Sequence, residues 1–79
     1  MDALVFVDRG RGGTWDVYAR DPKDLHLGTI REGKDSYLHV VAVRGTPLEG
    51  IRPGDHDDLA DAMAAIARHL KGTCTKGVP

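Results

Sequence analysis

The stretch "RGRGGTWDVYARDPKDLHLGTI" (9–30) decides the fold, because turn signals alternate in it with strand patterns. The glycines of 9–13 predict a flexible turn. In "TWDVYAR" (14–20), every second side chain is apolar, which predicts a strand with one face on the core. "DPKD" (21–24) is a turn, with Pro22 suited to its second position, and "LHLGTIRE" (25–32) returns as the next strand. The stretch is therefore predicted to form a β-hairpin.

Two further strands are predicted on either side of this hairpin. "ALVFVD" (3–8) is short, apolar and followed by a turn, and "SYLHVVAVR" (36–44) is rich in β-branched residues. The short turns between these segments predict an antiparallel meander of four strands, at 3–8, 14–20, 25–32 and 36–44. Residues 45–54 hold three glycines and two prolines, a density that excludes a regular element.

One helix is predicted over "DHDDLADAMAAIARHLK" (55–71). Leu59, Met63, Ile66 and Leu70 share one face at helical spacing. Asp55 is the expected N-cap, the acidic first turn and basic last turn complement the helix dipole, and Gly72 is placed to end the helix. Residues 73–79 are expected to be a frayed tail. The fold class is therefore α+β, in which an amphipathic C-terminal helix packs on the sheet in the order β-β-β-β-α.

Alternation also predicts which side chains of the second strand enter the core. Trp15, Val17 and Ala19 are expected to face the helix, while Tyr18 and Arg20 face outward. The first and fourth strands are apolar on both faces, so they leave open which face of the sheet the helix covers. The side on which Trp15 lies therefore stays open at this stage.

Length and composition limit the classes of function. A chain of 79 residues with a net charge of −1 predicts a single small domain, 1–79, with one core and little space for a deep pocket. The single cysteine excludes an internal disulfide and fits a reducing cytoplasm. The apolar run near the N-terminus is too short for a signal peptide or a membrane span, so no membrane association is expected. The bias toward Asp, Arg, Ala and Gly suggests a GC-rich genome, such as that of an actinobacterium or its phage, and the expected class is a phage- or actinobacterial-type accessory module.

The residues that could carry chemistry form no recognisable catalytic or metal-binding pattern. Zinc sites usually pair Cys-x2-4-Cys with His-x3-5-His, and the four histidines lack such a spacing, although His26 and His39 lie on neighbouring strands and could face each other. The carboxylates of "DHDD" (55–58) are explained by the helix dipole, and Cys74 lies in the expected tail. We therefore expect no catalytic residue, no metal ligand and no cofactor.

The residues Gly13, Trp15, Arg20, Asp21, Pro22 and Lys23, followed by Leu27, Gly28 and Thr29, resemble locally the plant ethylene-response-factor type of DNA-binding domain. A looser likeness links the chain to the arm-type DNA-binding domains of phage integrases. In the first family a three-stranded sheet enters the major groove, and arginines and tryptophans of the sheet contact DNA. The resemblance implies these contacts for Arg9, Arg11, Trp15 and Arg20.

Two functions follow from these expectations. The first is a non-enzymatic binding or regulatory protein that contacts another protein or a second copy of itself. Tyr, Trp and Arg dominate the energetics of protein interfaces, and an open meander leaves edge strands that could pair with a partner. The alternative is a DNA-binding domain that presents its sheet and its Gly/Arg turn to DNA. The candidate binding face comprises Arg9, Arg11, Trp15, Tyr18, Arg20, Tyr37 and His39.

Overall fold

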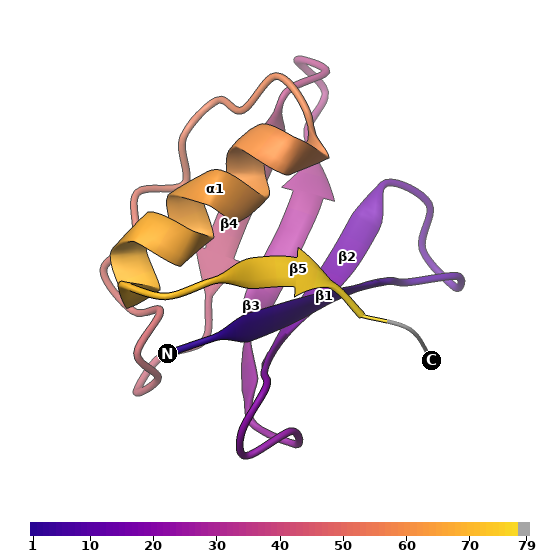
Figure 1. Cartoon of the computed structure of the whole chain (residues 1–79). Helices are drawn as coiled ribbons and strands as arrows, with labels where there is room; N and C mark the ends of the chain where they lie inside the picture. The colour runs from indigo at the N-terminus through magenta and orange to yellow at the C-terminus, as the bar shows by residue number, and fades with distance from the viewer. Residues whose placement is uncertain (78–79) are drawn as a thin grey trace.

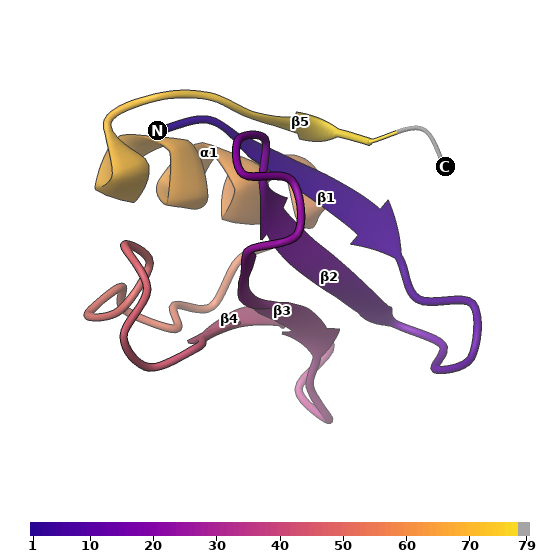
Figure 2. The same ribbon diagram turned by 90° about the horizontal axis from the view of Figure 1, so that it is seen from below.

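The computed structural model describes residues 1–77 and shows one twisted sheet with a helix packed on one of its faces (Figures 1 and 2). The elements, in chain order, are β1 (Ala3–Val7), β2 (Thr14–Ala19), β3 (His26–Glu32), β4 (Leu38–Ala42), α1 (Leu59–Leu70) and β5 (Cys74–Lys76). The sheet order is β4-β3-β2-β1-β5, and the pairs among β1 to β4 are antiparallel. The predicted α+β class is thus confirmed, and the four predicted strands pair antiparallel in chain order, one or two residues shorter at several ends. The predicted four-stranded antiparallel sheet is wrong in its strand number, because the sheet has five strands and one pair is parallel.

A fifth strand corrects the prediction of a frayed C-terminal tail. β5 pairs in parallel with β1, and the residues on either side of β5 add backbone hydrogen bonds to this pairing: Ala3 N–H donates to Thr73 O (2.8 Å) and Gly77 N–H donates to Val5 O (2.8 Å). A parallel partner is possible because α1 carries the chain back across the sheet before β5 begins. Three residues are too few to show a strand period, so the sequence of this segment gave no signal. Residues 78 and 79 of the expected tail lie outside the described residues.

The helix begins later than predicted. Asp58, and not Asp55, is the N-cap: its carboxylate accepts from Asp61 N–H (2.8 Å). Upstream of this cap, His56 exchanges both backbone hydrogen bonds with Leu38 (2.9 and 3.0 Å), so residues 53–56 run along the outer edge of β4. Lys71 is the C-cap of the helix, with a left-handed backbone (φ 55°). The sequence pattern predicts the end of the helix one residue later, at Gly72.

The core lies between the sheet and α1. Every strand from β1 to β4 contributes inward side chains, such as Val5, Val17, Ile30 and Val40, and the helix contributes Ala62, Ile66 and Leu70. Leu48, in the segment without regular structure, is fully buried among them, a core position that no periodic pattern marked.

The predicted faces of β2 are confirmed at Val17 and Ala19, which are buried, and Trp15 packs half-buried against the same core. Thr14 is buried as well, although the alternation predicts that it faces outward.

Within residues 1–77, no helix combines the length and the apolar character needed to cross a bilayer.

Candidate binding face

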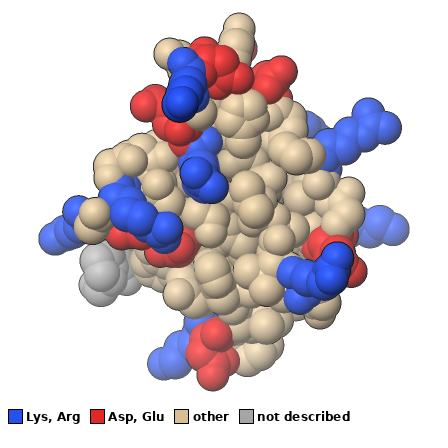
Figure 3. All heavy atoms as spheres, turned by 180° about the vertical axis from the view of Figure 1, so that it is seen from behind, with Lys and Arg blue, Asp and Glu red and all other residues tan. Residues whose placement is uncertain are grey.

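The sheet has a second face that no helix or strand within residues 1–77 covers. The pairing register places outward, on the side away from α1, the residues Leu4, Phe6, Asp16, Tyr18, His26, Thr29, Arg31, His39 and Val41. We call this set the outer face. Each of its members is half-buried or exposed, whereas the inward residues next to them are mostly buried; Thr14, which the register places opposite Arg31, is buried and is not counted in the set. Figure 3 shows this side of the molecule: its centre is mostly uncharged, and most of the Lys, Arg, Asp and Glu side chains lie around the periphery.

Aromatic rings stack across neighbouring strands of the outer face. Phe6 and Tyr18 meet edge to face, with ring centroids 6.0 Å apart, and the Tyr18 ring lies 4.9 Å from the imidazole of His26. This row crosses β1, β2 and β3, because Tyr18 pairs with Leu4 on one side and with His26 on the other. The stacking fixes three large side chains, so they need little further ordering when a partner binds.

One nitrogen of the third ring in this row, that of His26, is incompletely satisfied. The Nε2 atom of His26 is buried and has no hydrogen-bond partner within residues 1–77, and Asp16 Oδ1 lies 3.6 Å from it. A distance of 3.6 Å is too long for a hydrogen bond. The outer face therefore combines apolar rings with a polar group that a small movement could engage.

The structure disperses the seven residues predicted for the binding face. Tyr18 and His39 lie on the outer face. Trp15 lies on the opposite face, half-buried against the core, so it does not share a surface with Tyr18. Tyr37 is exposed in the turn before β4, where its N–H donates to Asp35 Oδ1 (3.0 Å).

The three predicted arginines lie at the two ends of β2. Arg20 follows β2 and is exposed, and its backbone N–H donates to Asp2 O (2.9 Å). Arg9 and Arg11 lie in the turn between β1 and β2. Arg11 Nε donates to Asp8 Oδ2 (3.0 Å), and this bond holds the pKa of the Asp8 carboxyl below its ordinary value. Part of the positive charge of the turn is thus already neutralised within the chain.

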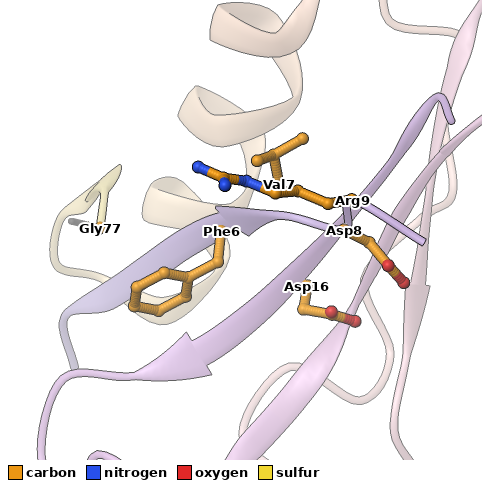
Figure 4. Close-up of a pocket in the computed structure, with 6 residues that line it drawn as sticks. All are labelled: Phe6, Val7, Asp8, Arg9, Asp16 and Gly77. Atoms are coloured by element: carbon orange, nitrogen blue, oxygen red, sulfur yellow. The ribbon is translucent and has the colours of Figure 1, made fainter. Parts of the chain in front are cut away.

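A shallow hollow of about 460 Å³ lies at the edge of β1, just beyond the end of β5 (Figure 4). It is lined by Phe6, Val7, Asp8, Arg9, Asp16 and Gly77. Phe6 and Asp16 point to one side of the strands and Val7 to the other, so the hollow wraps around the sheet edge. Val7 is 59% exposed there, on the side of the sheet that also carries Trp15, and so it is not part of the outer face.

His39 has partners that the sequence analysis missed. Its Nε2 lies 3.2 Å from Asp35 Oδ1, and its Nδ1 lies 3.6 Å from Asp55 Oδ1. The bond to Asp35 raises the pKa of the His39 imidazole and lowers the pKa of the Asp35 carboxyl. Neither aspartate has a sequence signal, because Asp55 was assigned to the helix and Asp35 to a turn. His26 is not close in register to His39, since His26 pairs with Tyr18 and His39 pairs with Arg31.

Comparison with known proteins gives one partial likeness. No family model and no solved structure matches this chain. The chain is 36% identical over 73 residues to a receptor-type adenylate cyclase B from Leishmania donovani. The match covers 89% of this chain but only 5% of the cyclase, so the chain spans about one-twentieth of the length of that relative. A likeness over so small a part does not carry the activity of the whole cyclase to this chain.

Proposed function

We propose that the protein is a small binding module that contacts another protein through the outer face of its sheet. The observation that carries this proposal is the asymmetry of the sheet: α1 covers one face, and no helix or strand among residues 1–77 covers the other, where Phe6 and Tyr18 are half-buried and Val41 is exposed. Val41 is 50% exposed, although valine is a residue that folding usually buries. Covering this surface with a partner removes apolar area from water, which favours association.

The composition of the outer face supports a protein partner. Protein interfaces are enriched in aromatic side chains at their centre and surrounded by a polar rim. Here the stacked rings of Phe6 and Tyr18 lie within the sheet, and charged side chains lie mostly around it (Figure 3). The net charge of −1 provides no strong field that would direct the module to a polyanion.

The edges of the sheet are less suited to binding than its face. Residues 53–56 already bond to the outer edge of β4, through Leu38 and through Val40 N–H, which donates to Pro53 O (3.1 Å). The opposite edge is β5, which has only three residues. Short or covered edges are the usual protection against strand addition, so we assign the contact to the face.

The test is to identify what contacts the outer face and then to measure that contact with purified proteins. A photo-crosslinking amino acid at position 41 should capture a partner that the same amino acid at position 64, on the exposed side of α1, does not. Binding of the purified partner should then weaken by about 2 kcal/mol, roughly thirtyfold in Kd, in Val41→Lys and stay unchanged in Ala64→Lys. Equal affinities for the two variants would refute the proposal. A second copy of the chain is one possible partner, and sedimentation of the protein alone detects it.

DNA binding is the second candidate, supported by the exposed Arg9 and Arg20 at the two ends of β2. Phosphate contacts by arginine make affinity fall steeply with salt. Fluorescence anisotropy with duplex DNA at low and at physiological salt should then show salt-dependent binding that is lost in the Arg11→Ala, Arg20→Ala double variant. No change in anisotropy at low salt would end this candidate, and it would leave the protein-binding proposal in place.

A further inference from the structure

Three metal-ligating side chains from separate segments converge beside the outer edge of β4. Asp35 lies in the turn between β3 and β4, His39 lies on β4, and Asp55 lies in the segment 53–56. One ligand atom from each, a carboxylate oxygen or an imidazole nitrogen, lies within 4.8 Å of the others. His39 also belongs to the outer face, but the stacked rings lie on β1, β2 and β3, and neither aspartate is a member of that face.

Backbone hydrogen bonds hold the two segments that carry the aspartates on either side of His39. In the turn, Gly33 N–H donates to Tyr37 O (2.9 Å), and Tyr37 N–H donates to the Asp35 carboxylate itself (3.0 Å). On the other side, His56 is bonded to Leu38 through both of its backbone groups. The main chain at all three positions is therefore fixed before any ion arrives, which lowers the entropic cost of assembling a site.

The donor set and its spacing suit a transition-metal ion better than a hard cation. An imidazole with two carboxylates is a ligand set that zinc accepts, with bonds of about 2.0–2.2 Å, so neighbouring ligand atoms lie roughly 3–3.5 Å apart. Asp35 Oδ1 lies 3.2 Å from His39 Nε2, which is within this range, whereas Asp55 Oδ1 lies 3.6 Å from the other ring nitrogen, Nδ1. Mg²⁺ and Ca²⁺ prefer oxygen ligands alone. We propose that Asp35, His39 and Asp55 form a binding site for a divalent transition-metal ion such as Zn²⁺.

One side chain has to turn for the three ligands to share an ion. The carboxylates flank different nitrogens of the imidazole, and an ion binds only one of them. Asp55 is the residue that moves, because its side chain is 71% exposed and rotates into water at little cost, whereas Asp35 is held by Tyr37 N–H. Three protein ligands leave a position for water, which gives the four-coordinate geometry that zinc favours.

A hollow of about 160 Å³ adjoins His39 and is lined by Arg31, Glu32, Gly33, His39 and Val41, but by neither aspartate. Arg31 and Glu32 bring one charge of each sign, so the two aspartates decide the local balance. An ion at this position would connect the β3–β4 turn to the segment 53–56 and thereby hold the start of α1 against the sheet.

The experiment is an isothermal titration of the full chain, without an affinity tag, with zinc, in which calorimetry measures the binding. We expect one saturable site, a higher melting temperature with Zn²⁺, and no comparable effect of Mg²⁺. His39→Gln and Asp55→Asn should each weaken zinc binding by about tenfold or more, as ligand loss does. Two controls should bind like the wild type: Asp57→Asn, which removes a nearby exposed carboxylate, and Cys74→Ser, which removes the thiol.

Two results would overturn the proposal. One is the absence of saturable zinc binding to the wild type, which would leave the three residues as an ionic cluster without metal. The other is zinc binding of equal strength in His39→Gln and in the wild type, which would place the ion elsewhere. Circular dichroism of each variant without zinc shows whether that variant is folded. Only folded variants are compared with the wild type, so a loss of zinc binding is not mistaken for a loss of folding.

Discussion

Replacing Gly28, a buried position of β3, with alanine should destabilise the protein strongly. A Cβ atom at position 28 would lie 2.5 Å from the carbonyl oxygen of Val41 and 3.1 Å from the Cα atom of Ala42. Both are backbone atoms of β4, so no side-chain rotation relieves the contact. Leu48 Cδ2, at 3.1 Å, closes the remaining space from the core side. The strands β3 and β4 must separate to accept the methyl group.

The magnitude follows from the cost of overpacking. Extra methylenes in a packed core cost about 1–3 kcal/mol, and a clash with backbone puts Gly28→Ala at the upper end, about 3 kcal/mol. Domains of this size have a total stability on the order of 4–12 kcal/mol. A loss of about 3 kcal/mol lowers the melting temperature by roughly 12–24 °C for a domain of 60–100 residues.

The assay is urea denaturation followed by circular dichroism, with Gly12→Ala as the matched control. A Cβ atom at Gly12 meets nothing within 4 Å, so the same substitution there should change the free energy of unfolding by less than about 0.5 kcal/mol. If Gly28→Ala unfolds at the same urea concentration as Gly12→Ala, β3 and β4 do not approach as closely as described and the reasoning fails.

Three further predictions concern the helix cap, the docking of β5 and the thiol. Asp58→Ala should cost about 1 kcal/mol of unfolding free energy and Asp55→Ala close to nothing, because only Asp58 caps α1; urea denaturation distinguishes them. Asp2 accepts a hydrogen bond from Thr73 N–H (3.0 Å), which lowers the pKa of Asp2 below its usual 3.8. Its stabilising effect is therefore complete above pH 3.8 and is lost as the pH falls through the lower folded-state pKa; stability measured from pH 2 to pH 6 should depend less on pH in Asp2→Asn than in the wild type. Burial raises the pKa of Cys74 to about 11, so iodoacetamide should alkylate it far more slowly at pH 8 in the native protein than in urea, and equal rates would contradict the burial.

Local sequence patterns predicted the elements that carry their own period. Alternation in β2 gave Val17 and Ala19 as core positions, and the 3.6-residue period gave Ile66 and Leu70. The order of β1 to β4 followed from the short turns between them, because short connections join antiparallel neighbours. These features depend on interactions between residues close in the chain, which a sequence displays directly.

The candidate site was predictable only in part, since it depends on faces and on long-range pairing. Alternation separated Trp15 from Tyr18, but the sequence did not say which of them the helix covers; packing against α1 places Trp15 toward the core and leaves Tyr18 on the outer face. The partners of His39 were missed because Asp55 reaches it only where residues 53–56 pair with β4.

The sequence by itself determined a small α+β domain with an antiparallel hairpin at its centre and one amphipathic helix. The tertiary structure alone decided the parallel docking of β5, the burial of Leu48 and the cluster around His39. Each of these depends on a contact between segments far apart in the chain, such as Ala3 with Thr73, and no local period records such a contact. The pattern of a segment reports which of its faces is apolar, but the rest of the fold decides what that face meets.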